Sequence, residues 1–332
     1  MSGGRSTGTR VAITGGTGFV GGHLAAHLVR QGHQVVIIAR GADRRPWARY
    51  IVGLPNTTLV QVGIGDVDGL AEAFAGCEAV AHCAGINREL DTQTYRAVHV
   101  DGTANVVRAA ERVGVRRLAL LSFLRARPDC GSGYHESKSA AEQIVRASGL
   151  EWTVLKPGMI YGRGDHMLEH LSRALHTFPV FVRLGSARVR PLAVDDVVRV
   201  LEAALVDGRL AHRTVPLVGP TELALDDAVE LIARATGRRP RMLRVPAVER
   251  LLPLAAWLTE RLMTTPALSI AQARILREEV IEPTLTPDRL PADLIPSTPF
   301  DIEHIRAGLP EPAPFDRTDL RCWKRLAHAG EG

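Results

Sequence analysis

The stretch TGGTGFVGGHLAAHLVRQGHQVVIIAR, residues 14–40, decides the fold of this chain. A short apolar run ends at Thr14, and Gly15, Gly16, Gly18 and Gly21 follow it, so both the Gly-x-Gly-x-x-Gly and the Gly-x-x-Gly-x-x-Gly spacings are present. Glycines at these spacings allow a tight turn, close approach of the backbone to a pyrophosphate, and contact between helix and strand. An amphipathic stretch and a second apolar run complete the sequence. This order predicts a dinucleotide-binding βαβ unit whose helix N-terminus faces phosphate groups.

The alternation of apolar runs and amphipathic stretches continues to about residue 160. Six runs are expected to be short buried strands: Val11–Thr14, Val35–Ala39, Leu59–Val62, Ala79–Cys83, Leu118–Ser122 and Thr153–Leu155. The amphipathic stretches between most of them are expected to be helices. Alternating strands and helices predict the α/β class, here a Rossmann-type doubly wound parallel sheet covered on both faces.

The second half of the chain is less regular, and we expect a division into parts. These are a flexible tail (1–9), an NAD(P)-binding Rossmann domain (10–162) to which elements near 188–219 return, and a smaller, mostly helical C-terminal substrate or interaction region (163–332). Helices are expected near 167–176, 194–206, 224–236, 246–263 and 270–279. The proline-rich stretch 282–300 cannot form a regular helix or central strand and is expected to wrap over a surface.

Composition narrows the class of protein. Apolar residues at 45% and charged residues at 23% are ordinary for a soluble globular chain of 332 residues. The net charge is +5, but the basic residues form no single run and aromatic residues make up only 5%. Stacking platforms for single-stranded nucleic acid are therefore not expected. An anionic small molecule suits this charge at least as well as RNA does.

Metal, disulfide and membrane signals are weak. The four cysteines show no metal or redox spacing, which is typical of reduced thiols in a cytoplasmic protein. His166-x-x-Glu169-His170 matches an inverted zinc-protease spacing, but no third ligand is assignable, so no metal site is expected. The N-terminus lacks the apolar core of a signal peptide. The apolar stretch Leu251–Leu258 is far shorter than the roughly 20 residues of a membrane span. We expect no transmembrane segment, and at most peripheral attachment to a membrane through a partner.

A second motif, GYHESKSAAEQ (133–143), places Tyr134 and Lys138 four residues apart in a helical pattern. With four tyrosines and three lysines in the chain, this spacing is expected by chance only about 0.04 times. Residues four apart share a helix face. A nearby cation favours the phenolate, and an acid–base group works best with a pKa drawn toward the operating pH. The pair is therefore a candidate proton-transfer device.

Together these motifs resemble the short-chain dehydrogenase/reductase superfamily, in its extended and atypical, epimerase/dehydratase-like branches. The resemblance covers roughly residues 10–220. Besides the glycine turn and the Tyr-Lys pair, it rests on GDVDGL (65–70), AVAHCAG (79–85), YRAVHVDGTANVVRAA (95–110), GLEWTVLKPGMIYGRGD (149–165) and VRPLAVDDVVRVLEAAL (189–205). Tyr134 follows Ser122 by only twelve positions, and the segment 268–310 forms a second, C-terminal region of resemblance. Both features are similar to relatives of the NAD(P)H-binding accessory subunit of respiratory complex I.

The resemblance implies a set of cofactor contacts: Gly15, Gly18, Phe19, Val20, Gly21, Arg40, Asp66, Val67, Ala84, Lys138 and Pro157. Arg40 stands nineteen residues after Gly21, at the end of the second strand, with Arg44 and Arg45 in the same loop. An acidic residue there suits the ribose of NAD, whereas an arginine suits the 2′-phosphate of NADP. NADP is therefore the expected cofactor, with NAD as the alternative.

The resemblance also implies a catalytic set of Tyr134, Lys138 and Ser122. Lysine would bind the nicotinamide ribose, tyrosine would exchange a proton with the substrate, and serine would polarise a carbonyl. Two departures stand out. His99 replaces the family's usual asparagine, and Phe123 and Leu124 occupy positions where further Ser or Thr residues are typical.

Three interpretations of function remain open at this point. The first is an NAD(P)-dependent oxidoreductase or epimerase/dehydratase-type enzyme that acts on a small oxygenated substrate, as a homo-oligomer or in a larger complex. The second is a catalytically silent NADP(H)-binding accessory or assembly protein of a respiratory-type complex. The third and weakest, RNA binding, rests only on the basic charge balance.

Overall fold

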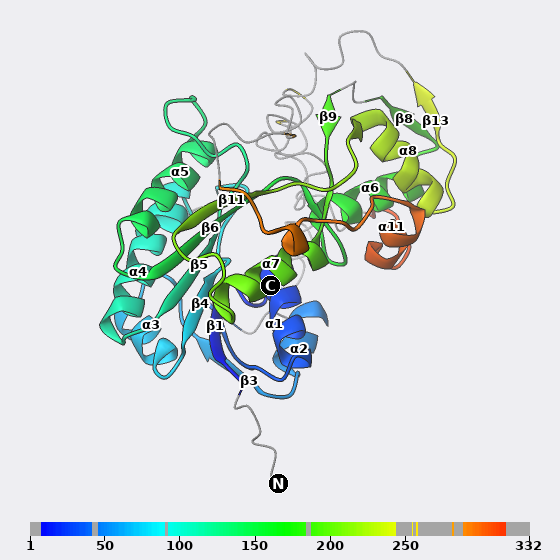
Figure 1. Cartoon of the computed structure of the whole chain (residues 1–332). Coiled ribbons are helices and arrows are strands. Elements are labelled where there is room, and N and C mark those ends of the chain that lie inside the picture. Colours follow the sequence, from blue (N-terminus) through cyan, green and yellow to red (C-terminus); the bar gives the residue numbers. More distant parts are fainter. Residues whose placement is uncertain are drawn as a thin grey trace, which may run out of the picture. The chain divides into compact units, whose positions relative to one another are not determined.

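The computed structural model describes residues 8–41, 46–89, 92–183, 187–243, 254, 257, 281 and 288–316. They belong to two compact units (Figure 1). Unit 1 draws on 1–158, 194–217 and 283–296, and unit 2 on 159–193, 218–282 and 297–332. The expected tail 1–9 lies mostly outside the described residues, as do Arg44, Arg45 and almost all of the helices expected at 246–263 and 270–279.

Unit 1 is built on a seven-stranded sheet with the order β11-β6-β5-β4-β1-β2-β3, and every pair in it is parallel. The strands are β1 Arg10–Thr14, β2 Gln34–Ala39, β3 Thr57–Gln61, β4 Ala79–His82, β5 Arg117–Leu121, β6 Glu151–Pro157 and β11 Arg213–Leu217. The direction of winding reverses between β1 and β4. Ligands of doubly wound sheets bind at the carboxyl ends of the strands beside this reversal. The predicted Rossmann-type α/β fold is confirmed.

The third strand differs from its predicted bounds, because it begins at Thr57 and ends at Gln61 rather than covering Leu59–Val62. It lies at the edge of the sheet, where one side has no neighbouring strand. Its threonines pair in register with Val35 and Val36 of β2. The search for a buried apolar run missed these β-branched polar residues, which suit a partly exposed edge strand.

Helices cover both faces of this sheet (Figure 1). They are α1 Phe19–Arg30, α2 Pro46–Val52, α3 Val67–Phe74, α4 Gly102–Arg112, α5 Gly133–Arg146 and α7 Val194–Leu205, and a π-helical segment, η1 Arg96–Asp101, leads into α4. The helices α3, α4 and α5 pack side by side on one face, and α1 and α7 pack together on the other. Buried residues such as Phe74, Leu118 and Val145 form the core beneath α3, α4 and α5. This packing fixes the loops at the strand ends.

Unit 2 contains three described α-helices of at least seven residues, α6 His166–Thr177, α8 Leu225–Ala235 and α11 Ile302–Gly308. Three two-stranded pairs accompany them: β7 Ile160–Tyr161 with β10 Leu192–Ala193, β9 Arg188–Val189 with β12 Leu223–Ala224, and β8 Val180–Val182 with β13 Arg241–Leu243. The described part of the proline-rich stretch, most of which belongs to unit 1, forms only a short 3-10 turn, η2 Ala292–Leu294. No helix in the described ranges has the length and apolar character needed to cross a bilayer.

Candidate functional site

Backbone hydrogen bonds hold the glycine turn that joins β1 to α1. Gly15 has a φ of +69°, and its N–H donates to the carbonyl of Ile38, 3.1 Å away. The N–H of Gly18 donates to the carbonyl of Gly15 at 2.9 Å. A Cβ on Gly21 would lie 2.4 Å from that same carbonyl oxygen, so no larger residue fits without moving the turn. The predicted requirement for glycine is therefore a physical one at positions 15 and 21.

The start of α1 suits a phosphate group. The helix begins at Phe19, and its first N–H groups have no intrahelical acceptor. The first turn carries no acidic side chain that would compete for these donors. Phe19, Val20 and Gly21 therefore present backbone N–H groups at a positive helix end, as a pyrophosphate requires. The described residues fit a dinucleotide here.

The other expected cofactor residues gather at the carboxyl ends of neighbouring strands. Arg40 follows β2, and its aliphatic stem comes within 3.6 Å of the Cβ that Gly63, after β3, would carry. Asp66 caps α3, with Oδ1 accepting from the Gly69 N–H at 3.0 Å, and Val67 begins that helix. Pro157 closes β6. Because parallel strands end at one edge, these side chains share the edge that holds the glycine turn.

The loop after β4 connects the glycine turn to α5. A Cβ on Gly15 would approach the Cα of Ala84 to 2.9 Å, so this loop packs directly on the turn. One residue later, a Cβ on Gly85 would lie 3.3 Å from Nζ of Lys138. Ala84 and Gly85 therefore bring the phosphate-binding turn and the Tyr-Lys helix to opposite sides of one short loop.

The helix α5 carries both members of the predicted pair, and both side chains are buried. Nζ of Lys138 donates to the carbonyl of Leu121 at 3.0 Å. Burial lowers the pKa of Lys138 to about 8, although Cys83 and Glu142 partly oppose this shift. Burial raises the pKa of Tyr134 above its ordinary value, and the neighbouring Tyr95 adds to this rise. The phenol is therefore protonated throughout the neutral range.

Aromatic side chains surround Tyr134. Its ring centroid lies 5.5 Å from that of Phe123, 5.6 Å from His135 and 5.7 Å from both Tyr95 and His99. All four contacts are edge-to-face, the arrangement favoured by aromatic quadrupoles. Phe123 therefore occupies one side of the phenol, at a position where the family commonly has a hydroxyl.

Ser122 takes part in a separate buried network. Its hydroxyl donates to Oε1 of Glu142 at 2.5 Å, and Nζ of Lys156 donates to the same oxygen at 2.6 Å. Arg146 reaches Oε2 at 2.8 Å. Glu142 lies two helical turns beyond Tyr134 on α5. The observed partner of Ser122 is thus a buried carboxylate, and the predicted role of this serine in polarising a substrate stays a prediction.

His99 is held by two directional hydrogen bonds. The N–H of Ile86 can only donate, so Nε2 of His99 accepts it at 3.1 Å and Nδ1 carries the proton. Nδ1 then donates to Oγ of Ser137 at 2.9 Å, and the Ser137 hydroxyl donates to the backbone carbonyl of Tyr134 at 2.9 Å. Burial, together with Lys138, lowers the pKa of His99 to about 2. This neutral histidine links the β4 loop to the helix turn that bears the phenol.

A second buried histidine extends the network to the glycine turn. Thr103 donates to the carbonyl of His99 at 2.5 Å, so its hydroxyl oxygen accepts from Nε2 of His82 at 3.0 Å. Nδ1 of His82 accepts from the hydroxyl of Thr14 at 2.7 Å. Burial, again with Lys138, lowers the pKa of His82 to about 3. The network therefore runs from the residue before Gly15 to the backbone of Tyr134.

The residues that sequence reasoning missed are His82, Thr103, Ser137 and Glu142. One signal was visible for His82, a polar residue at the end of the otherwise apolar run AVAH. The π-helical form of η1 around His99 is a second mark, although only the structure shows it. Such π-turns are frequent at functional sites. Glu142 and Ser137 stand at ordinary polar positions of a helix, and nothing local marks them as buried.

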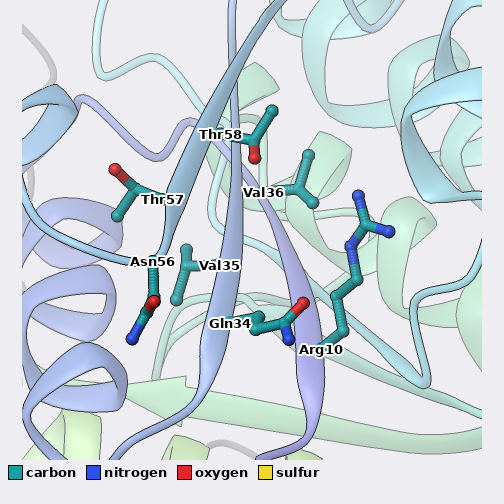
Figure 2. Close-up of a pocket in the computed structure, with 7 residues that line it drawn as sticks. All are labelled: Arg10, Gln34, Val35, Val36, Asn56, Thr57 and Thr58. Atoms are coloured by element: carbon teal, nitrogen blue, oxygen red, sulfur yellow. The ribbon is translucent and has the colours of Figure 1, made fainter.

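Two places outside this network carry a histidine pair and a surface hollow. The rings of His166 and His170 lie 6.4 Å apart on α6, but no group of three or more His, Cys, Asp or Glu residues in the described ranges could hold a metal ion. A hollow of about 310 Å³ lies at the amino ends of β1, β2 and β3 (Figure 2). Its lining is Arg10, Gln34, Val35, Val36, Asn56, Thr57 and Thr58. It occupies the edge of the sheet opposite the glycine turn and contains no acid–base pair.

Comparison with known proteins agrees with this geometry. The NAD(P)H-binding family profile matches residues 15–179. An uncharacterised protein of Mycobacterium tuberculosis is 30% identical over 80% of this chain, which spans only 27% of that relative's length. The 40 kDa subunit of NADH-ubiquinone oxidoreductase from Neurospora crassa is 25% identical, covering 85% of this chain and 75% of the subunit. A ceramide reductase of Caulobacter vibrioides is 29% identical, covering 71% and 73%.

Solved structures show the same fold. The Bordetella bronchiseptica enzyme WbmH, crystallised with NAD⁺, superposes with a TM-score of 0.64 and 21% identity, covering 91% of this chain and 97% of WbmH. A UDP-glucuronic acid 4-epimerase of Bacillus cereus, also crystallised with NAD, has a TM-score of 0.63 and 16% identity, covering 90% and 98%. At this identity the likeness concerns the fold alone. The glycine turn, the sheet order and the profile match over residues 15–179 agree with one another, and the expected resemblance of this chain to NAD(P)H-binding proteins of the extended and atypical short-chain dehydrogenase/reductase type is confirmed.

Proposed function

We propose that this protein is an NADP(H)-dependent reductase of small carbonyl compounds, with Tyr134 as the proton donor. One observation carries the proposal: a protonated, buried phenol lies on the same helix face as a lysine that adjoins the cofactor loop. A phenol with a raised pKa can donate a proton at neutral pH but is a poor base. Reduction therefore suits this site better than alcohol oxidation does.

The proposed mechanism assigns one task to each residue. The bound nicotinamide supplies the hydride. Tyr134 gives its hydroxyl proton to the carbonyl oxygen as that oxygen gains negative charge. Lys138, fixed by Leu121 and adjoining Gly85, binds the ribose side of the cofactor and places positive charge near the phenol. His99 and Ser137 hold the helix turn that carries Tyr134. Ser122 acts in this proposal through Glu142, as a positioning residue.

A second candidate function is supported by the relatives. Here the protein binds NADP(H) without turnover, as an accessory or assembly subunit. The Neurospora relative is a subunit of NADH-ubiquinone oxidoreductase, and Phe123 fills a position typical of a catalytic hydroxyl. The ceramide reductase relative favours the enzyme. Both functions would use the same glycine turn to bind the cofactor, so only a measurement of turnover distinguishes them.

The decisive experiment follows NADPH oxidation against a panel of aldehydes and ketones. Tyr134→Phe is expected to leave NADPH affinity within about twofold and to lower turnover by about 10²–10⁴-fold, the usual contribution of a positioned acid. Tyr50→Phe, which alters an exposed tyrosine on α2, is the matched control and should keep full activity. An active protein whose Tyr134→Phe variant keeps its rate excludes the proposed donor. Tight NADPH binding without turnover on any compound favours the accessory function.

A further inference from the structure

We infer that Arg88 forms an oxyanion subsite, so that the preferred substrate carries a carboxylate or phosphate group besides its carbonyl. The inference rests on the proposed reductase function and names the substrate class for that site. Arg88 lies in the loop after β4, three residues beyond Gly85 and at the carboxyl edge of the sheet. It is none of the residues expected to bind the cofactor.

One donor atom of the Arg88 guanidinium has no hydrogen-bond partner among the described residues. This atom, Nη1, is buried. The neighbouring Glu89 carboxylate is not the partner of Nη1; its Oε1 instead accepts the backbone N–H of Tyr95 at 2.7 Å. A buried donor on a charged group costs free energy unless an acceptor is supplied. A bound anion would supply it.

The loop that carries Arg88 is fixed beside the phenol. On one side of Arg88, Ile86 donates to His99, and the hydroxyl of Tyr95 donates to the carbonyl of Asn87 at 3.0 Å. On the other side, Glu89 accepts from Tyr95. The ring of Tyr95 in turn contacts that of Tyr134. Three residues span at most about 10 Å, so Arg88 remains near the Lys138 end of the site.

The chemistry of arginine determines the class of ligand. Its planar fork of N–H donors matches two oxygens of a carboxylate or a phosphate, and its charge does not titrate in the physiological range. A carbonyl compound bearing such an anion could place its carbonyl at Tyr134 and its charged end at Arg88. The substrate would then be oriented by two points, which also fixes the face presented to the hydride.

Matched pairs of substrates test the inference. The reaction is NADPH + H⁺ + RCHO → NADP⁺ + RCH₂OH, with the proton delivered through Tyr134. We compare 4-carboxybenzaldehyde with benzaldehyde, and glyceraldehyde 3-phosphate with glyceraldehyde. The unmodified protein is expected to prefer the anionic member of at least one pair by about 10- to 100-fold in kcat/KM. Arg88→Gln should remove that preference, through a fall of about 10- to 100-fold in kcat/KM for the anionic member. The pair that shows the preference distinguishes carboxylate from phosphate.

Arg96→Gln is the control for loss of charge, because the side chain of Arg96 is 83% exposed. It should keep the preference. Equal rates for both members of each pair in the unmodified protein, or a preference retained in Arg88→Gln, would overturn the inference. So would a loss of NADPH affinity in Arg88→Gln without substrate, since Arg88 would then be a cofactor contact.

A binding measurement separates this inference from the proposed function. If no aldehyde is turned over, the NADPH-loaded protein is titrated with benzoate and with phenyl phosphate, and the nicotinamide fluorescence is followed. Saturable binding that Arg88→Gln weakens about tenfold or more supports the subsite even though the reductase proposal fails. Absence of binding to both anions overturns the subsite as well.

Discussion

The glycine turn and the face of α5 that carries Tyr134 both contact the loop after β4. The residues of the turn are determined by the backbone of the turn itself, whereas the contacts on α5 depend on residues elsewhere in the chain. In the turn, a Cβ on Gly21 would strike the carbonyl of Gly15, so the residue type follows from backbone geometry. On α5, several of the contacts join side chains that are distant in sequence. His99 and Ser137 are separated by 38 positions, and Ser122 and Glu142 by 20.

This difference shows which departures from a family pattern matter. The turn has no room for a side chain at position 15 or 21, because a single added carbon would displace the backbone there. The helix face tolerates several departures, provided that buried polar groups stay paired. His99 is an example, because its two ring nitrogens both have partners although the family's usual residue is absent. A departure in such a network is therefore weak grounds for assuming loss of function.

The largest effect is expected from breaking the network around Glu142. Glu142→Ala leaves Lys156 buried without its carboxylate, and the loss of one partner of a buried ion pair typically costs about 3–5 kcal/mol. The free energy of unfolding, measured by urea denaturation, should fall by this amount. Glu72→Ala, which removes an exposed carboxylate on α3, should change it by less than about 0.5 kcal/mol. Equal stability of the two variants would show that the network on α5 is dispensable.

The sequence predicted those features that local backbone geometry or helix and strand periodicity ties to a particular type of residue. Glycines 15, 18 and 21, the alternating apolar runs and the Tyr-Lys spacing together predicted the sheet, the cofactor edge and the helix of the pair. The edge strand β3 was shifted, because threonines pair there without being apolar. The partners of Ser122 and the histidine network could not be predicted, since they depend on which polar residues from separate elements meet in the interior. Hydrogen-bond partners of this kind depend on tertiary packing and produce no periodic pattern in the sequence.

The second prediction tests the glycine turn, where backbone geometry determines the residue type. In Gly21→Ala the new methyl group must displace the Gly15 carbonyl, and with it the N–H groups that face the phosphates. Charge-assisted hydrogen bonds contribute about 1.5–3 kcal/mol each, so loss of one or two should weaken NADPH binding by about 100-fold. Fluorescence titration measures this. Gly149→Ala is the control, because its Cβ would make only an ordinary contact at 3.8 Å, and unchanged affinity in both variants would contradict the proposed turn geometry.

Arg40 lies at the same carboxyl edge of the sheet as the glycine turn, but it would bind the cofactor through its side chain and not through the backbone. It therefore tests whether a side chain at this edge determines the choice of cofactor. If it holds the 2′-phosphate, the protein should bind NADPH about 10- to 150-fold more tightly than NADH. Arg40→Asp should abolish or invert that ratio, whereas Arg30→Asp, at the far end of α1, should not. Equal affinity of the unmodified protein for both cofactors would remove the assignment.

The smallest effect is expected from the titration of Lys138, which lies on α5 and adjoins the loop between the two regions. Burial lowers the pKa of Lys138 to about 8 in the free protein, below its ordinary value of 10.5. The ammonium is therefore present below pH 8 and is lost as the pH rises through that value. The phosphates of a bound cofactor favour the charged form, so binding takes up a proton above pH 8. NADPH affinity should then fall by up to about tenfold per pH unit just above pH 8, since one pKa unit corresponds to 1.36 kcal/mol. Lys138→Arg keeps its charge throughout and should show a flat profile from pH 7 to 9. An equally flat profile in the unmodified protein would mean that this lysine does not sense the cofactor, and the two regions would then be joined by packing alone.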